Sequence, residues 1–200
     1  SERTYIRKAQ YSFGWDWGPA FPTMGIWKPI YFKAQTPVFI KNVRFHTLSI
    51  SRNRAEVQIN LDLTGKTGDY KFDIWLKNGK ELHHVTSKVR KKSYVQIRYF
   101  IKNPVLWWPN GEGEPGLYEL SVHLKNSENE LVDEKIVNVG IRTIRLLLHD
   151  KKKQEFRFLV NGRVIFMKGA NWIPADSFLT RIDDKKYENL LGMARDCHMN

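Results

Sequence analysis

The sequence lacks most of the features that tie a fold together covalently or mark a cellular compartment. Its single cysteine, Cys197, rules out a disulfide within the chain, so the fold must be held by burial, and we expect the thiol itself to be buried. No apolar run approaches the roughly 20 residues of a membrane span, so no membrane partner is expected. The sequence has no Asn-X-Ser/Thr glycosylation sequon and no recognisable targeting segment.

Metal and nucleic-acid binding have little support either. The histidines at His83-His84 and His198 have no cysteine or carboxylate at ligand spacing, so we expect neither a metal nor a cofactor. The formal net charge of +12 attracts phosphates in general. However, the densest basic runs, Lys88–Lys92 and Lys151–Lys153, fall where a strand-rich sequence turns, and no nucleic-acid-binding motif accompanies them. These runs predict a solvated basic surface and no nucleic-acid partner.

Alternating apolar and polar residues dominate from Val38 to about Leu148. Turn signals such as Asn78-Gly79 separate the alternating runs, at the spacing of an antiparallel sandwich of about seven strands. The clearest runs begin at Val43, Ala55, Tyr70, Tyr94, Leu117 and Ile136. The pattern predicts one all-β domain of roughly 110 residues.

The segment before this domain is too short to fold alone. Ile26–Phe32 is strand-like, but about 35 residues do not make an independent core. We therefore expect it to be the tail of an earlier domain.

The segment after the sandwich predicts a hairpin and then a helix. Phe156–Met167 turns at Asn161-Gly162, the strongest short hairpin signal. Asp183–His198 has apolar residues at helical spacing and two aspartates in its first turn. A strand followed by a helix makes one βα unit, whose sheet or barrel is expected to continue beyond Asn200. Both ends of the chain are thus expected to cut through domains.

Ser12–Trp27 has the composition of a recognition loop. It holds three tryptophans, one aspartate, three glycines and two prolines, which neither a helix nor a plain strand favours. Tryptophan faces stack on the C–H-rich faces of sugars, and a carboxylate between two of them can accept hydrogen bonds from hydroxyls. These residues favour carbohydrate as the ligand.

Three blocks of the sequence resemble the β-mannosidases of glycoside hydrolase family 2, in the same order and over almost the whole chain. They are Arg7–Pro19 with Gly25-Ile-Trp27, Leu106–Gly111 with Gly116-Leu-Tyr118, and Val160–Phe178. The second and third kinds of block occur across the wider family, which includes β-galactosidases and β-glucuronidases. Gly14-Trp-Asp-Trp-Gly-Pro19 is the block that indicates a mannosidase.

The resemblance implies a mainly β fold in three parts. Residues 1–36 would be the C-terminal strands of a sugar-binding jelly-roll domain, residues 37–150 a complete immunoglobulin-like sandwich, and residues 151–200 the first βα unit of a truncated TIM barrel. A whole barrel takes about 250 residues. The acid/base and nucleophile glutamates implied by the family would therefore lie outside this chain, and we assign no catalytic residue within it. Asp183-Asp184 and Glu112–Glu114 are expected to be solvated carboxylates.

The resemblance also implies substrate-binding residues. Trp15 would form one wall of the pocket for a terminal mannose, and Asp16 would bind the hydroxyls of that sugar. The alternative is a buried aromatic corner in which Asp16 caps a turn. Asn171 follows the expected first barrel strand, where it would either shape the sugar site or lock a loop through backbone amides. Packing or structural roles are expected for Trp17, Phe21, Trp27, Trp107, Trp108, Pro109, Trp172 and Asp176.

The resemblance thus implies part of a retaining exo-β-mannosidase acting on the non-reducing ends of β-mannoside oligosaccharides, and we expect the 200-residue chain alone to be inactive. Two alternatives stay open. One is a non-catalytic carbohydrate-binding module, and the other is a related family 2 β-galactosidase or β-glucuronidase. Animal relatives imply a lysosomal location and turnover of N-glycan cores.

Overall fold

The computed structural model describes residues 2–65, 68–79, 81–90, 92–150 and 153–200. Two compact units make up the chain: Ala34–Met167 with Asn200, and Ser1–Lys33 with Lys168–Met199. Within the predicted basic runs, Lys91 and Lys151-Lys152 lie outside the described residues. None of the helices in the described ranges combines the length and the apolarity of a membrane span.

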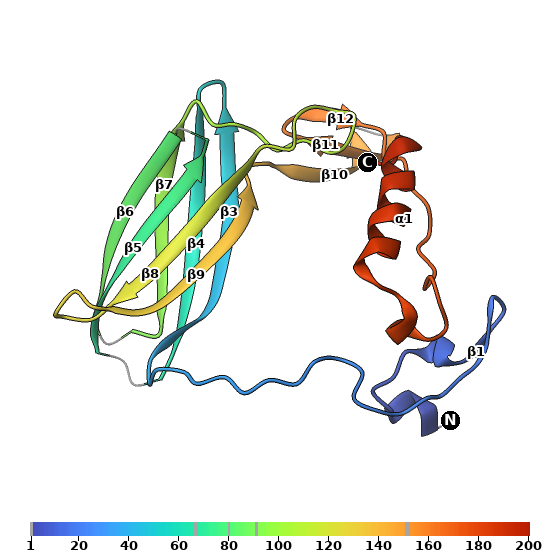
Figure 1. Ribbon diagram of the computed structural model, residues 1–200. Coiled ribbons are helices and arrows are strands. Elements are labelled where there is room, and N and C mark those ends of the chain that lie inside the picture. Colours follow the sequence, from blue (N-terminus) through green and yellow to red (C-terminus); the bar gives the residue numbers. More distant parts are fainter. Residues whose placement is uncertain (1, 66–67, 80, 91, 151–152) are drawn as a thin grey trace. The chain divides into compact units, whose positions relative to one another are not determined.

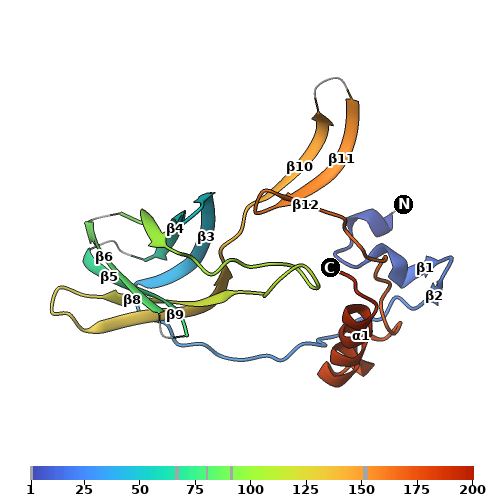
Figure 2. The same cartoon turned by 90° about the horizontal axis from the view of Figure 1, so that it is seen from above.

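Seven antiparallel strands form the sandwich of the first unit, as the alternating runs predict (Figure 1). One sheet has the order β3-β4-β7 and the other the order β6-β5-β8-β9. Seen from above, the two sheets lie as two layers (Figure 2). The strands are β3 (Phe39–Ser51), β4 (Arg54–Thr64), β5 (Asp69–Asn78), β6 (Glu81–Arg90), β7 (Tyr94–Lys102), β8 (Leu117–Lys125) and β9 (Leu131–Gly140).

Period-two alternation places one face of each central strand in the core. In β4 the side chains of Ala55, Val57 and Ile59 are buried, while those of Glu56 and Gln58 between them are only partly covered. The same alternation in β5 and β8 supplies the facing layer, because successive side chains of a strand point to opposite sides of its sheet. The buried members of this layer are Phe72, Ile74, Leu76, Tyr118, Leu120, Val122 and Leu124.

A buried tyrosine joins the start of β8 to the loop after β7. Tyr118 has no exposed surface, and its hydroxyl oxygen accepts a hydrogen bond of 2.8 Å from the backbone N–H of Val105. Burial raises the pKa of this phenol, so the hydroxyl stays protonated. The arrangement matches the tyrosine corner of immunoglobulin-like sandwiches, in which a tyrosine near the start of the sixth strand bonds to upstream backbone.

One carboxylate on the outer face of the four-stranded sheet is almost fully covered. The side chain of Asp73 is 5% exposed and lies between Lys71 Nζ at 3.1 Å and Lys125 Nζ at 3.0 Å. Thr86 Oγ1 donates to it at 3.1 Å, and His84 Nε2 lies 3.5 Å away. Burial by itself raises the pKa of Asp73, but the bonds from Lys125, Lys71 and Thr86 outweigh burial and lower the pKa to about 2.

This carboxylate makes the stability of the sandwich depend on pH in acid. The pKa of Asp73 falls from 3.8 to about 2 on folding, so its contribution is complete above pH 3.8 and is lost as pH falls through 2. We expect the free energy of unfolding to decrease by about 2 kcal/mol over that interval. Urea unfolding of the chain at several pH values measures the decrease.

Asp73→Asn should abolish most of this pH dependence. Asp62→Asn is the matched control, because it breaks the more exposed pair of Asp62 with Arg44 and should cost less than about 1 kcal/mol. If the free energy of unfolding of Asp73→Asn falls just as steeply with decreasing pH, another group causes the pH dependence.

A three-stranded sheet follows the sandwich. It contains β10 (Ile144–Asp150), β11 (Lys153–Val160) and β12 (Arg163–Ile165) in that order. The predicted hairpin at Asn161-Gly162 is confirmed, with φ of 50° and 82°, the left-handed pair that a two-residue type I′ turn requires. The end of the alternating region therefore forms β10, which pairs with β11 and not with the sandwich sheets.

The hairpin turn bonds to the loop between β7 and β8. Asn161 Nδ2 donates to the carbonyl of Trp107 at 3.0 Å, and its Oδ1 accepts from the N–H of Thr143 at 3.0 Å. Arg163 lies over the ring of Trp108 with its guanidinium carbon 4.3 Å from the ring centroid. Both tryptophans are half-buried, in keeping with the packing role that we expect for them.

The second unit contains the remaining short elements. They are η1 (Glu2–Tyr5), η2 (Gln10–Ser12), β1 (Phe13–Trp15), β2 (Gly18–Ala20), η3 (Leu179–Arg181) and α1 (Asp184–Asp196). The predicted helix is confirmed: Asp183 is its N-cap, and Asp183 Oδ1 accepts from the N–H of Lys186 at 2.8 Å. The predicted burial of Cys197 is wrong, because the thiol is exposed and α1 itself buries no residue.

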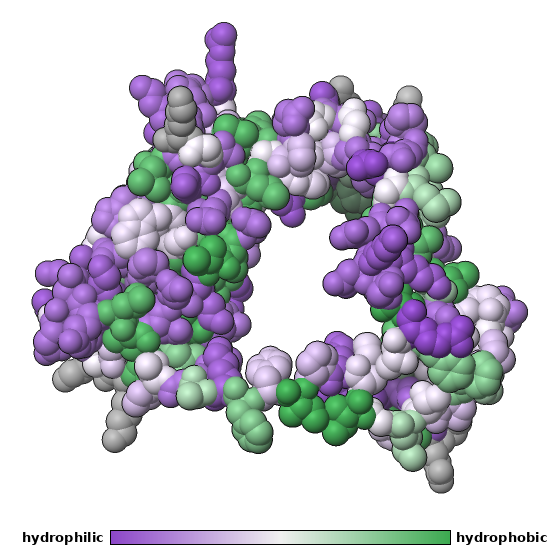
Figure 3. Space-filling view, in the orientation of Figure 1, coloured by the Kyte–Doolittle hydropathy of each residue, from purple (hydrophilic) through white to green (hydrophobic). Residues whose placement is uncertain are grey.

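The prediction of a strand at Ile26–Phe32 is also wrong for the described residues. This segment has no regular structure, and apolar atoms gather along the chain between β2 and β3 (Figure 3). Ile26 is 79% exposed and Phe32 is fully exposed. A strand-like sequence forms a strand only where a neighbouring strand supplies the hydrogen-bond ladder, and no described segment pairs with this one.

Candidate functional site

The residues predicted to bind sugar lie at the tip of a short hairpin. β1 pairs with β2 through Phe13↔Ala20 and Trp15↔Gly18, so Asp16 and Trp17 form the connecting turn. Trp15 is 60% exposed, and Asp16 is exposed as well. The side chain of Asp16 makes no hydrogen bond or ion pair with any other described residue. The alternative of a buried aromatic corner capped by Asp16 is therefore wrong.

Aromatic contacts hold this hairpin to its surroundings. The ring of Trp17 lies 5.4 Å from that of Tyr11, and the ring of Phe21 lies 4.9 Å from that of Phe178. These contacts agree with packing roles for Trp17 and Phe21, although each side chain stays about 40% exposed. The turn is thus anchored through Trp17 and the base of the hairpin through Phe21, and no ring contact of Trp15 is seen among the described residues.

Asn171 lies in the irregular segment between β12 and η3. Its side chain is exposed and has no hydrogen bond among the described residues, and no ring contact or hydrogen bond joins it to Trp15 or Asp16. The structure brings Trp15 and Asp16 together at one turn but does not join Asn171 to them.

Asp176, and not Asn171, fixes the backbone of this irregular segment through hydrogen bonds. Asp176 Oδ1 accepts from the N–H of Phe178 at 2.8 Å, and Oδ2 lies 2.9 Å from Arg181. The backbone bond from Phe178 is the main cause that lowers the pKa of Asp176. Trp172 stacks on Tyr187 of α1 with ring centroids 6.4 Å apart. The structural role expected for Asp176 is confirmed, while Trp172 stays 55% exposed and its structural role stays a prediction.

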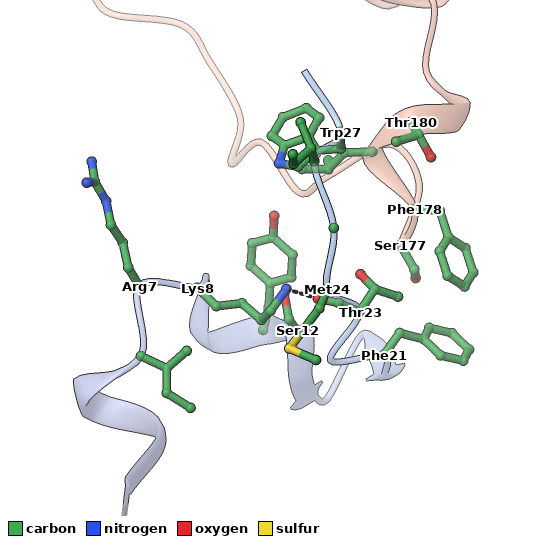
Figure 4. A pocket seen from close by; sticks show the side chains of 15 residues that line it. Arg7, Lys8, Ser12, Phe21, Thr23, Met24, Trp27, Ser177, Phe178 and Thr180 are labelled. Atoms are coloured by element: carbon green, nitrogen blue, oxygen red, sulfur yellow. Dashed lines mark hydrogen bonds between the residues drawn. The ribbon is translucent and has the colours of Figure 1, made fainter. Parts of the chain in front are cut away.

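A hollow of about 620 Å³ opens at the base of the hairpin (Figure 4). Its walls come from residues 6–27 and from the segment before and into η3. Neither Trp15, Asp16 nor Asn171 lines it. The sequence signal that overlaps this lining is the tryptophan-rich composition of Ser12–Trp27. Trp27, which we expected to be a packing residue, contributes one wall. The lining residues are Ile6, Arg7, Lys8, Tyr11, Ser12, Phe21, Thr23, Met24, Gly25, Ile26, Trp27, Ser177, Phe178, Leu179 and Thr180.

The described side chains include no group suited to bind a metal ion. Across the described ranges, no three side chains of histidine, cysteine, aspartate or glutamate lie close enough together to hold an ion. Two of the carboxylates that we expected to be solvated have structural partners, since Glu112 Oε2 accepts from Arg163 at 3.0 Å and Asp183 caps α1.

A seven-stranded immunoglobulin-like sandwich occurs in many functional classes, so the fold by itself does not define one. Residues 38–142 match the model of glycosyl hydrolases family 2, and residues 1–28 match the family's galactose-binding domain-like model. The first match covers more than half of the chain. The chain belongs to glycoside hydrolase family 2.

Its similar relatives include several β-mannosidases. Beta-mannosidase B of Aspergillus flavus is 35% identical over 191 residues, covering 92% of this chain, and β-mannosidase of Bos taurus is 33% identical over 211 residues, covering 98%. The chain spans 22% and 23% of the length of these two relatives.

Solved structures agree with these relatives. The β-D-mannosidase of Dictyoglomus thermophilum is 37% identical, with a TM-score of 0.87 over 97% of this chain and 24% of that one. A β-glucuronidase of Bifidobacterium dentium has a TM-score of 0.68 over 82% of this chain and 26% of that one. Its identity of 19% shows the fold alone.

Proposed function

We propose that this chain is part of a retaining exo-β-mannosidase that releases terminal β-mannose from the non-reducing ends of oligosaccharides. The observation that carries the proposal is the exposed Trp15-Asp16 turn, in a chain about 35% identical to β-mannosidases. The family 2 sandwich alone supports only a glycosidase of this family, because β-glucuronidases share that fold.

In this proposal the hairpin tip contributes two contacts to the sugar. Asp16 accepts hydrogen bonds from adjacent hydroxyls of mannose, which a carboxylate without another partner can do with both oxygens. Trp15 covers a face of the ring and excludes water. Asn171 is retained as a third contact, which its exposed and unbonded side chain permits.

The proposed domain layout accounts for why we assign no catalytic pair to the described residues. Residues 1–36 end a jelly-roll domain, residues 37–150 form the immunoglobulin-like domain, and residues 151–200 begin the barrel. The matches of the family models to residues 1–28 and 38–142 support the first two assignments. Retention needs two carboxyl groups about 5–5.5 Å apart. We place both glutamates in the barrel beyond these residues.

The test compares the complete protein with the 200-residue chain on chromogenic glycosides. We expect the complete protein to hydrolyse the aryl β-mannoside at least about 100-fold faster than the matching β-galactoside or β-glucuronide, because a pocket built for particular hydroxyls rejects their epimers. The chain alone should give no hydrolysis above background. A preference for galactoside or glucuronide would assign the protein to another activity of the family, and turnover by the chain alone would contradict our placement of the glutamates.

A lysosomal location belongs to the same proposal. Its support is the presence of goat and bovine β-mannosidases among the relatives, beside fungal and bacterial ones. Subcellular fractionation of the source cells, followed with an antibody against the sandwich, tests it.

A further inference from the structure

The arginines along the middle of the three-stranded sheet have acidic partners on its outer face. Arg44 donates to Asp62 through two hydrogen bonds, of 2.7 Å and 3.0 Å. Arg98 lies 3.8 Å from Glu56, whose side chain is 25% exposed. The charges of this part of the sheet are therefore balanced within the sandwich.

Two cations at one end of the same sheet face each other instead. Arg54 begins β4 and Lys102 ends β7, and the register places them directly opposite each other on neighbouring strands. Neither side chain makes a hydrogen bond or an ion pair with any other described residue. Like charges directly opposite each other in an antiparallel pair are destabilising. An anion bound between these two side chains would relieve that repulsion.

The same two cations line a pocket of about 350 Å³, which we call the basic pocket. Its other lining residues are Ser51, Asn53 and Phe100, so no carboxylate is among the described residues that line it. The side-chain amide of Asn53 adds a neutral hydrogen-bond donor. The volume is large enough for a small ligand. The lining therefore favours an anion over a neutral or cationic ligand.

The basic pocket is held in shape before any ligand arrives. The guanidinium carbon of Arg54 lies 4.4 Å from the ring centroid of Phe100, so the ring supports one face of the cation and leaves the N–H groups at its edge. Ser51 Oγ donates to the carbonyl of Arg54 at 3.0 Å, and the N–H of Asn103 donates to the carbonyl of Asn53 at 2.7 Å. These bonds join the β3–β4 turn to the end of β7 (Figure 1). A preformed site lowers the entropy that is lost on binding.

We propose that the basic pocket binds the phosphate or sulfate group of a ligand. The planar guanidinium of Arg54 donates to two oxygens of the anion, and the ammonium of Lys102 contacts a third. A free anion and an ester carried on a sugar present the same oxygens to these cations. The site goes beyond the proposed glycosidase function and does not depend on it, because its residues lie on the sandwich and not on the β1–β2 hairpin.

Calorimetric titration of the complete protein at low salt, with inorganic phosphate and with glucose 6-phosphate, tests the proposal. We expect a Kd on the order of 1 mM for both, because a few charge-assisted hydrogen bonds at an exposed site give weak binding. Arg54→Gln should raise the Kd about 10-fold, and Lys102→Gln about threefold. Lys102→Glu, which gives Arg54 the missing carboxylate, should raise it more than about 30-fold.

Lys77→Gln is the matched control. Lys77 is an exposed lysine of β5, on the other sheet, so the substitution removes the same charge far from the basic pocket. The Kd of this variant should stay within about twofold of wild type, because charges beyond a Debye length are screened. Circular dichroism of all variants checks that the fold is intact.

Three results would overturn the proposal. They are no binding of either compound up to about 50 mM, an unchanged Kd in both Arg54→Gln and Lys102→Gln, and an equal loss in Lys77→Gln, which would show a response to net charge alone. The two compounds then distinguish the source of the anion. Tighter binding of glucose 6-phosphate by at least about threefold, lost in Phe100→Ala, supports an ester on a sugar, and an equal Kd supports the free anion.

Discussion

Asp16→Asn in the complete protein is expected to lower kcat/KM for an aryl β-mannoside by about 100-fold. The carboxylate is exposed at the hairpin turn and has no other partner among the described residues, so its oxygens are free for sugar hydroxyls. Hydrogen bonds to a charged acceptor are worth about 1.5–3 kcal/mol, and 1.4 kcal/mol is one factor of ten. Steady-state hydrolysis of 4-nitrophenyl β-mannoside measures the loss.

A matched control is available on the sandwich. Asp69→Asn removes another exposed carboxylate, at the start of β5, and should leave kcat/KM unchanged. Circular dichroism of both variants checks that the fold is intact. If Asp16→Asn retains activity within about threefold of wild type, Asp16 does not bind the reacting sugar, and the assignment of the hairpin tip fails.

Tyr118→Ala is expected to destabilise the chain by about 4 kcal/mol, the largest effect on stability that we predict. The ring is completely buried in the sandwich, and its hydroxyl satisfies the backbone N–H of Val105. Removal of the side chain leaves a cavity and an unpaired amide. Tyr118→Phe keeps the ring and should cost only about 1–2 kcal/mol, so the pair of variants separates packing from the hydrogen bond. Urea unfolding gives both values.

Tyr94→Phe is the control for this pair. Tyr94 is 44% exposed on β7, and loss of its hydroxyl should change the free energy of unfolding by less than about 0.5 kcal/mol. An equal cost for Tyr118→Phe and Tyr94→Phe would mean that the bond to Val105 contributes nothing measurable. The start of β8 would then be held by packing alone.

The sandwich was predictable because its signal is local and repeated. Period-two alternation with turn residues between the runs already predicts which faces of β4, β5 and β8 are buried. Asn161-Gly162 predicts a type I′ hairpin for an equally local reason, since few residue pairs accept two positive φ angles. Asp183 predicts the start of α1 through one side-chain bond to the backbone three residues later.

Two predictions that depended on contacts with distant segments were wrong. Ile26–Phe32 is strand-like in composition, but no described segment pairs with it. Cys197 follows the apolar spacing of α1, yet it is exposed, because burial depends on what covers the helix and not on periodicity.

The sequence by itself determined the family blocks, the seven-stranded sandwich, the hairpin and the helix, because each depends on contacts between near neighbours or on a repeating pattern. Only the tertiary structure decided that Trp15 and Asp16 project from a turn, that Asp176 rather than Asn171 locks its segment, and that Ser12 and Phe178 share a hollow. The shared hollow joins residues far apart in the chain, and the first two facts depend on which side chains the surrounding elements leave exposed or bonded. Side-chain contacts across such separations depend on the packing of whole elements, which no short stretch of sequence specifies.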